Sequence, residues 1–147
     1  MKKILPTTLL LICLITMLCF SIFFPIKKIL TFPISLLGLL PLAAGLALSV
    51  LGSNKFEEVG TNIKTFADPD VVVTEGLYRF SRNPMYLGFV FVLFGVAILF
   101  GKLSPFVVVV TFFLIADRWY IIFEERAMDR KFGETYQNYK IQTRRWL

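Results

Sequence analysis

The chain has 147 residues, of which 56% are hydrophobic and 16 are phenylalanine, and its formal net charge is +6. The core of a soluble domain of this length needs less apolar surface, so the composition predicts a single membrane domain over residues 1–147. The positive charges form no organised basic face with stacking aromatic residues, which excludes nucleic acid as a partner. The chain has no histidine and both of its cysteines lie in the first apolar stretch, which excludes a metal site built from these residues.

Four apolar stretches predict an all-α integral membrane protein with about four transmembrane helices. They cover residues 4–24, 29–51, 85–100 and 105–123. Each comes close to the roughly 20 residues that cross a hydrocarbon layer of about 30 Å. Lysines precede the first stretch as they precede a signal peptide, but no small-residue cleavage site follows it, so we expect a retained helix. The turns at 25–28 and 101–104 are short, so we expect two antiparallel hairpins.

The positions of Lys and Arg predict the orientation. Of 16 such residues, 12 lie at the amino terminus, between residues 52 and 83, or after Phe123, while 3 lie in the two short turns and one, Arg118, lies in the last apolar stretch. The positive-inside rule therefore places both termini and the middle segment (52–83) on the cytoplasmic side. We expect this segment, with its Asp68-Pro69-Asp70 run, to lie outside the bilayer and residues 71–73 to be extended.

Two pairs of glycines predict close helix packing. Gly38 and Gly45 are seven residues apart, as are Gly88 and Gly95, so each pair falls on one helix face. Small residues on a shared face allow helix backbones to approach closely. We therefore expect packing surfaces at both pairs.

A polar cluster precedes the third apolar stretch. Asn83 and Pro84 are typical of the N-cap and the first position of a helix, so they predict its start. Four other side chains crowd the same helix start: Tyr78, Arg79, Arg82 and Tyr86. Because the backbone N–H groups at a helix start also favour negative charge, we expect an anionic ligand group or a partner carboxylate there.

A second polar cluster ends the fourth apolar stretch. Glu124 and Glu125 follow it, and Asp117 and Arg118 lie within it, where unpaired charge is costly and must face protein or water. Residues seven apart share a helix face, which pairs Arg118 with Glu125 and Asp117 with Glu124. This polar stripe predicts the wall of a cavity that opens to the cytoplasm and that a lipid-tailed substrate enters from the side.

Several common catalytic signatures are missing from the sequence. It has no histidine, no Gly-rich phosphate loop and no Gly-x-Ser-x-Gly elbow. The reaction must therefore need little acid–base help. Transfer of an activated group satisfies this constraint, because it depends mainly on desolvation and alignment.

Three motifs occur in a fixed order along the chain. They are Gly76-x-Tyr78 with Ser81-Arg82-Asn83-Pro84-Met85-Tyr86-Leu87-Gly88, then Glu124-Glu125-Arg126, then Phe132-Gly133, Tyr136, Tyr139 and Arg144-Arg145-Trp146. Together they resemble the isoprenylcysteine carboxyl methyltransferase and phospholipid methyltransferase group of membrane enzymes. The resemblance covers about residues 59–147, whereas the first two helices are similar in hydropathy alone.

The resemblance implies a methyltransferase that binds S-adenosylmethionine at the cytoplasmic face and takes a lipid-like or prenylated acceptor from the membrane. Carried over by position, the cofactor-binding residues are Gly76, Tyr78, Asn83, Pro84, Tyr86, Leu87, Glu124 and Glu125. The catalytic residues are Arg82, Arg118, Glu124 and Glu125. A carboxylate suits the ammonium group or ribose hydroxyls of this cofactor, and a tyrosine face suits its sulfonium cation.

One position departs from the resembled pattern, since many relatives have His where this chain has Asn83. Asparagine does not titrate near neutrality, so it can position a cofactor but not act as a base. This slightly favours O- or S-methylation, because an amine acceptor must first lose a proton, to Glu124 or Glu125. The basic and aromatic tail either lies at the membrane interface or uses Arg144 or Arg145 to hold the cofactor or an acidic acceptor.

Two other functions remain open at this point. The first is an NADPH-dependent membrane reductase of the sterol type, whose carboxyl-terminal motif also has an arginine, a proline and a tyrosine at a helix start. The second is a non-enzymatic membrane protein that binds a lipid or a partner subunit. The sequence does not distinguish among the possible methyl acceptors.

Overall fold

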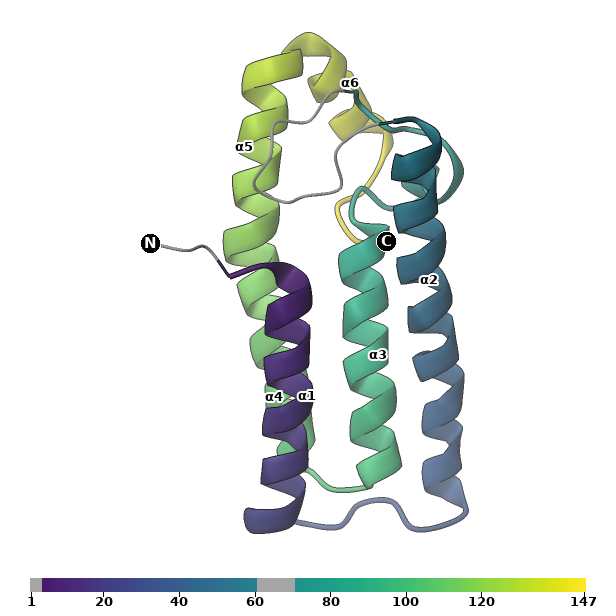
Figure 1. The fold of residues 1–147 in the computed structure, drawn as a ribbon, viewed down its shortest axis with the longest axis vertical. Helices are drawn as coiled ribbons and strands as arrows, with labels where there is room; N and C mark the ends of the chain where they lie inside the picture. The colour runs from purple at the N-terminus through teal and green to yellow at the C-terminus, as the bar shows by residue number, and fades with distance from the viewer. Residues whose placement is uncertain (1–3, 61–70) are drawn as a thin grey trace.

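The computed structural model describes residues 4–60 and 71–147, and every regular element in these ranges is a helix. In chain order the elements are α1 (Pro6–Phe23), η1 (Ile34–Gly38), α2 (Leu39–Glu58), η2 (Gly76–Arg79), α3 (Pro84–Phe100), α4 (Ser104–Ile115), η3 (Ala116–Tyr120), α5 (Ile121–Phe132) and α6 (Glu134–Gln142). The last long helix is continuous, because α4, η3 and α5 follow one another without a break (Figure 1). The predicted all-helical fold is confirmed.

Among the described residues, three helices are long and apolar enough to cross a membrane: Pro6–Phe23, Ile34–Glu58 and Ser104–Phe132. The helix α3 is as apolar but has 17 residues, which is near the lower limit of about 17 for a spanning helix. The four apolar helices lie side by side, and α5 and α6 extend beyond them at one end (Figure 1).

Three predicted helix boundaries differ from the structure. The second helical segment begins at Ile34 instead of residue 29, and it continues to Glu58 instead of ending at residue 51. The fourth continues past Phe123 to Phe132. Hydropathy detects the part of a helix that lipid or protein buries, whereas backbone hydrogen bonds continue through polar turns. In the last turn of α2, for example, Lys55 pairs with Glu58 at 3.1 Å.

Glycines on both helices bring α2 and α3 close together. A Cβ atom on Gly45 would lie 2.5 Å from the Gly88 carbonyl oxygen, and one on Gly95 would lie 2.6 Å from the Gly38 carbonyl oxygen. Side-chain carbons do not approach backbone atoms so closely, so only glycine permits this helix separation. The packing role expected for the four glycines is confirmed.

The predicted pairing of the first two helices into a hairpin is wrong. The helix α3 lies between α1 and α2, and α1 packs against α4 and α3 (Figure 1). Met17 of α1 is fully buried in the same cluster as Leu93 of α3 and Phe112 of α4. The close contact at the glycines packs α2 against α3. The turn predicted at 25–28 therefore does not determine which helices pack together.

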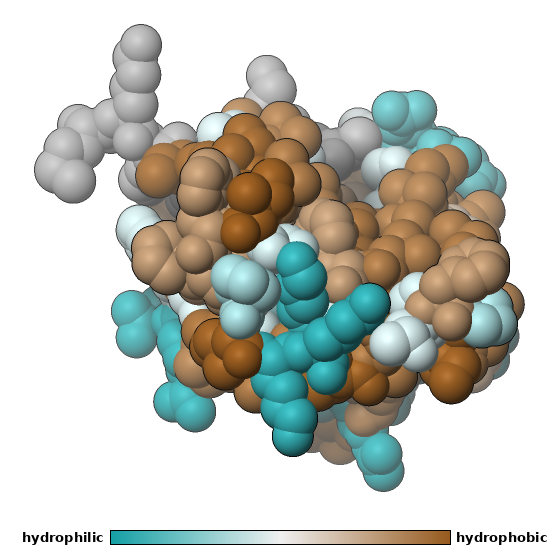
Figure 2. Space-filling view, turned by 90° about the horizontal axis from the view of Figure 1, so that it is seen from below, coloured by the Kyte–Doolittle hydropathy of each residue, from teal (hydrophilic) through white to brown (hydrophobic). Residues whose placement is uncertain are grey.

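The connections at one end of the bundle pair with each other. The Gly101 carbonyl oxygen accepts the N–H groups of Ile29 and Leu30 at 2.8 and 3.1 Å, and Lys28 and Lys102 form an isolated antiparallel bridge. Gly101 has φ +63°, and a Cβ atom there would meet the Leu30 carbonyl oxygen. Figure 2 views this end, where apolar residues dominate around a compact hydrophilic group.

The middle segment is described only at its two ends. Its first residues, up to Glu58, belong to α2, so they are helical. The Asp68-Pro69-Asp70 run lies outside the described residues. Residues 71–73 belong to no helix or strand, and Val73 is buried.

Candidate functional site

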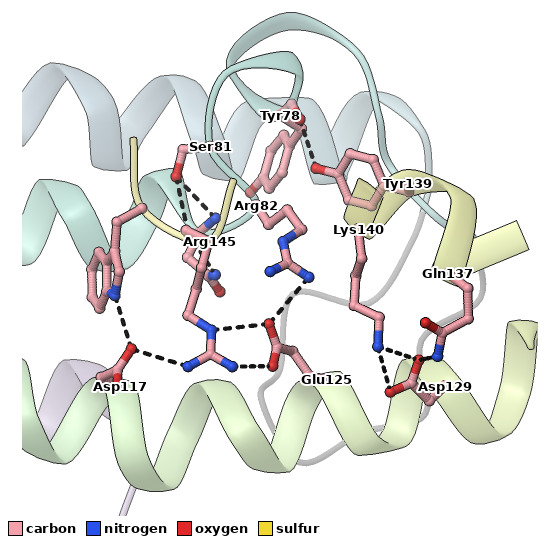
Figure 3. A network of polar contacts seen from close by, with 12 residues as sticks. Tyr78, Ser81, Arg82, Asp117, Glu125, Asp129, Gln137, Tyr139, Lys140 and Arg145 are labelled. Atoms are coloured by element: carbon pink, nitrogen blue, oxygen red, sulfur yellow. Dashed lines mark hydrogen bonds and ion pairs between the residues drawn. The ribbon is translucent and has the colours of Figure 1, made fainter. Parts of the chain in front are cut away.

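The start of α3, the end of the α4–η3–α5 helix, α6 and the carboxyl-terminal residues meet in one polar cluster (Figure 3). The backbone N–H of Arg82 donates to the Arg144 carbonyl oxygen at 2.9 Å. The Tyr139 hydroxyl donates to the Tyr78 carbonyl oxygen at 2.6 Å. The tail therefore lies directly against the polar segment that precedes α3, as the order of the sequence motifs indicates.

Asn83 occupies the N-cap position of α3 and Pro84 its first helical position, which confirms the predicted helix start. The Asn83 side chain makes no capping hydrogen bond. Its Nδ2 instead donates to the Arg145 carbonyl oxygen at 3.0 Å. The tail carbonyl competes for this side chain, so Asn83 joins the tail to α3.

Glu125 is the centre of the charged contacts. Its Oε2 accepts from Arg145 Nη2 at 2.6 Å, and its Oε1 accepts from Arg145 Nε at 3.2 Å. Arg145 Nη1 also donates to Asp117 Oδ1 at 3.3 Å, and Trp146 Nε1 donates to the same oxygen at 2.9 Å. The hydrogen bond to Glu125 raises the pKa of the Arg145 guanidinium above its usual value, against partial burial. The paired donors fix Arg145 in one orientation.

A π-helical turn brings Asp117 to this cluster. Residues Ala116–Tyr120 form the turn, and the Ile121 N–H donates to the Ala116 carbonyl oxygen. A π turn adds a residue to the helix, so residues eight apart come to share a face across it. Asp117 and Glu125 are eight apart and both contact Arg145. The predicted faces, which paired residues seven apart, are therefore wrong.

Arg118 lies apart from the cluster. Its side chain is 77% exposed, and its Nε pairs with Asp117 Oδ2 at 3.1 Å. The same π turn that directs Asp117 inward directs its neighbour outward. The structure therefore does not bring Arg118 to the other residues expected to be catalytic.

Arg82 is the most buried cation of the cluster, at 11% exposed. Its Nη1 lies 3.2 Å from Glu125 Oε1, close enough for an ion pair. Its Nε and Nη1 are nevertheless buried without a hydrogen bond to any residue that the structure describes. Buried donors normally have acceptors, so this guanidinium has spare capacity for an anionic group. The partner carboxylate expected at the start of α3 is Glu125.

Three tyrosines support this end of the site. Tyr78, Tyr136 and Tyr139 are all buried. Burial, and after it the negative charge of Glu125, raises the pKa of Tyr136 to about 12, although Arg82 lowers it. Burial also raises the pKa of Tyr78 and Tyr139. The hydroxyls of Tyr78 and Tyr139 donate to the backbone carbonyl oxygens of Gly52 and Tyr78.

A separate groove begins at Glu124. The Tyr86 hydroxyl donates to Glu124 Oε1 at 2.8 Å, and both residues line a cavity of about 390 Å³. Its other walls are Leu5, Pro6 and Thr7 at the start of α1, Ser49, Val50 and Ser53 on α2, and Met85 and Phe89 on α3. Leu5 and Val50 are also exposed on the outer surface, so the groove reaches the surface of the bundle.

The predicted cavity and the observed groove lie on different faces of the last long helix. The predicted wall included Asp117, Arg118 and Glu125, but of the acidic residues only Glu124 lines it. Adjacent residues of a helix point about 100° apart, so Glu124 and Glu125 face different surroundings. The first faces the groove, and the second faces the tail (Figure 3).

The remaining predicted site residues do not line the groove. Gly76 begins η2 with φ +62°, and open space surrounds its Cα. Tyr78 is buried against α2, with its hydroxyl 3.4 Å from the Gly52 carbonyl oxygen. Pro84 and Leu87 are buried within the helix packing. The sequence motif thus contains structural residues as well as residues that face the groove.

Ser81 and Trp146 contribute contacts to which the sequence assigned no role, and Asp117, which was expected in the wall of the cavity, instead pairs with Arg145 and Trp146. Ser81 Oγ accepts the Asn83 N–H at 3.1 Å and donates to the Arg145 carbonyl oxygen at 3.4 Å. A charge inside an apolar helix was the available signal for Asp117. Nothing in the sequence indicates that its partner is the last tryptophan.

Comparison with known proteins identifies the family of the chain. Residues 33–135, more than half of the chain, match the family described as phospholipid methyltransferase. The chain belongs to the phospholipid methyltransferase family. This family match includes η1 and α2, so it begins earlier than the resemblance over residues 59–147, and it ends before the tail.

One relative of the chain is an uncharacterized protein of Haemophilus influenzae. It is 33% identical over 63 residues, which cover 43% of this chain and 100% of that protein. No solved structure matches the chain. Membership of the phospholipid methyltransferase family therefore rests on the family match.

Proposed function

We propose that this protein transfers a methyl group from S-adenosylmethionine to a lipid-like acceptor at the cytoplasmic face of a membrane. Family membership supports methyl transfer in general. The observation that carries the more specific proposal is the groove: an apolar cavity of about 390 Å³ that contains one carboxylate, Glu124. Such a cavity is in the size range of small-molecule sites, and a few polar groups in an apolar lining suit an amphipathic molecule.

Charge and helix length support four spans with both termini in the cytoplasm. The loops at the end seen in Figure 2 carry Lys27, Lys28 and Lys102, whereas residues 124–147 carry six Lys and Arg residues. The 17 residues of α3 extend about 25 Å at 1.5 Å per residue, which is sufficient to span with slight thinning of the bilayer. On this topology the polar cluster lies at the cytoplasmic end.

The described residues fit S-adenosylmethionine in charge. This cofactor carries a carboxylate, an ammonium group and a sulfonium. Arg82 pairs with Glu125, and its Nε and Nη1 have no hydrogen-bond acceptor among the described residues, so this guanidinium would bind the carboxylate. Glu124 would bind the ammonium group or the ribose hydroxyls. When bound, the cofactor supplies a methyl group on a cationic sulfur, which is a good leaving group.

The residues of the chain have three tasks in such a transfer. The apolar walls exclude water from the groove, which strengthens the electrostatic contacts inside it. Tyr86 holds Glu124 in one orientation through the 2.8 Å hydrogen bond. Glu124 can also accept a proton from an acceptor that must lose one. Alignment of the acceptor in the groove supplies most of the rate acceleration, as in other transfers of an activated group.

Glu125 does not serve as a ligand-binding group in this proposal. Both of its oxygens already pair with arginines, Oε1 with Arg82 and Arg145 and Oε2 with Arg145. A cofactor would have to displace an arginine to reach it. The two adjacent glutamates therefore have different roles, and only Glu124 faces a ligand.

Methyl transfer from labelled cofactor tests the proposal. The purified protein is placed in phospholipid vesicles with methyl-labelled S-adenosylmethionine, and label is measured in the lipid-extractable fraction. We expect the label to appear with the parent protein and with Lys28→Gln at the opposite end, and to be lost with Glu124→Gln. A lipid fraction without label, across vesicles that contain amine, hydroxyl and prenylated carboxylate amphiphiles, would contradict the proposal.

A further inference from the structure

The carboxyl-terminal segment, residues 143–147, crosses the polar segment before α3 and is hydrogen-bonded to it along its length. The Arg82 N–H donates to the Arg144 carbonyl oxygen at 2.9 Å, and Asn83 Nδ2 donates to the Arg145 carbonyl oxygen at 3.0 Å. These contacts involve the backbone of the segment (Figure 3). They leave its side chains available for a different surface.

That different surface is the long helix on the other side of the segment. Trp146 Nε1 and Arg145 Nη1 both donate to Asp117 Oδ1, at 2.9 and 3.3 Å. The Trp146 ring packs on Phe113 with 4.8 Å between the ring centroids. The segment is thus held between α3 and the helix that carries Asp117.

The π turn gives Asp117 its place in this arrangement. A carboxylate in the middle of an apolar helix is costly unless it is paired. The turn at Ala116–Tyr120 rotates Asp117 toward the tail, where the Trp146 N–H and the Arg145 guanidinium satisfy it. A π turn itself is a departure from the favoured helix geometry, and such turns often occur at functional sites.

We propose that Asp117, Arg145 and Trp146 form a clamp that fixes the start of α3, and with it the buried guanidinium of Arg82. They act as positioning residues that touch no ligand, and Glu125 is the counter-ion of the clamp. The clamp assigns Arg145 to structure, where sequence reasoning left it as a candidate ligand for the cofactor. Its effect on ligand binding rests on the proposed function, whereas its existence does not.

Two features of the chain make the clamp separable from the rest of the site. The tail lies beyond the family match, which ends at residue 135. Arg144 is a matched control, because it is adjacent to Arg145 but its side chain is exposed and no side-chain contact joins it to a described residue. A general loss of positive charge in the tail would affect both arginines equally.

Fluorescence of Trp146 tests the clamp without any ligand. The chain has two tryptophans, so Trp119→Phe leaves Trp146 as the only one. In this background we expect a soluble quencher to reach Trp146 poorly. Asp117→Asn and Arg145→Gln should each increase the quenching constant about threefold, since loss of a shared ion pair frees the segment, and Arg144→Gln should leave it unchanged. Unchanged quenching in Asp117→Asn and Arg145→Gln would overturn the clamp.

Affinity for S-adenosylmethionine tests the positioning role in the same proteins. We expect Asp117→Asn and Arg145→Gln each to raise the dissociation constant about tenfold, and the double variant to raise it no further, because both residues act through one contact. Additive losses, or freed Trp146 with unchanged affinity, would overturn positioning. If the parent protein binds no S-adenosylmethionine, the proposed function fails, and the quenching result still decides whether the clamp exists.

Discussion

Tyr86 donates a hydrogen bond to Glu124 Oε1 over 2.8 Å, and this contact joins the first turn of α3 to α5 at the groove. The next residue along the helix, Glu125, lies on a different face of the helix and pairs with Arg82 and Arg145. A pair of adjacent carboxylates thus divides between a ligand groove and an internal ion-pair network. Substitution of Glu124 should therefore affect ligand binding, and substitution of Glu125 should affect stability.

Glu124→Gln should weaken binding of S-adenosylmethionine at least about tenfold, while the free energy of unfolding changes by less than about 1 kcal/mol. The amide oxygen can still accept the Tyr86 hydrogen bond, but the negative charge that attracts a cation is gone. Calorimetric titration and thermal unfolding in detergent measure the two effects. Glu134→Gln, at an exposed position of α6, is the control. Equal affinity in Glu124→Gln and the parent protein would remove Glu124 from the site.

Glu125→Gln should lower the free energy of unfolding by about 2 kcal/mol or more. The Glu125 side chain is 14% exposed, and its loss leaves Arg82 and Arg145 without their shared counter-ion. An exposed carboxylate at a helix end would contribute little to stability. Thermal unfolding of Glu125→Gln beside Glu124→Gln checks it, and equal melting temperatures for the two variants would contradict the assigned roles.

Gly45→Ala should destabilise the bundle by about 1–3 kcal/mol, because its new methyl group would overlap the Gly88 carbonyl oxygen at 2.5 Å. Leu40→Ala on the same helix is the control, since Leu40 is 70% exposed. Thermal unfolding of both variants measures the difference. A Gly45→Ala protein as stable as Leu40→Ala would mean that α2 and α3 are further apart than described.

Stability should fall as pH rises from about 10 to 12, in part through Tyr136. Burial raises its pKa from an unfolded value of about 10 to about 12 in the folded state. Between these values the folded protein holds more protons than the unfolded protein, so rising pH favours unfolding, by at most about 3 kcal/mol. The melting temperature of Tyr136→Phe should therefore depend less steeply on pH across this window. Identical slopes would show that Tyr136 titrates normally.

Apolar composition was sufficient to predict the approximate positions of the long apolar helices, because long apolar runs have few alternatives to a membrane helix. The glycine pairs at Gly38 and Gly45 and at Gly88 and Gly95 were also readable, since their spacing matches the helix repeat. The sequence did not show that the two glycine pairs contact each other. The contact between α2 and α3 depends on the shape of both helices, and the short turn predicted at 25–28 favoured a different pairing.

Of the predicted site residues, Tyr86 and Glu124 line the groove, and the arrangement of the others was not predicted. The Asn83-Pro84 pair correctly predicts the start of α3, because its residue types suit a helix start. The faces of the last helix were predicted with a regular repeat of 3.6 residues, and the π turn at Ala116–Tyr120 shifts that repeat by one residue. No residue type marks such a turn, so the sequence paired Asp117 with Glu124, whereas in the structure Asp117 and Glu125 both contact Arg145, and Arg118 is exposed.

The role of the tail also depends on contacts between residues distant in sequence. The partners Asp117 and Trp146 are 29 residues apart, and Asn83 and Arg145 are 62 apart. Basic and aromatic residues at the end of a membrane protein suit the membrane interface equally well. Only the fold indicates that Arg145 faces two carboxylates and that Arg144 is exposed.

Calorimetric titration of the detergent-purified protein with S-adenosylmethionine, its demethylated product and NADPH tests the central claim most directly. The account predicts saturable binding of the first two, weakened in Glu124→Gln, and no binding of NADPH. Binding of NADPH alone would contradict it and favour the membrane reductase. Absence of binding by all three, with phospholipid added to the detergent, would contradict any S-adenosylmethionine-dependent function for this site.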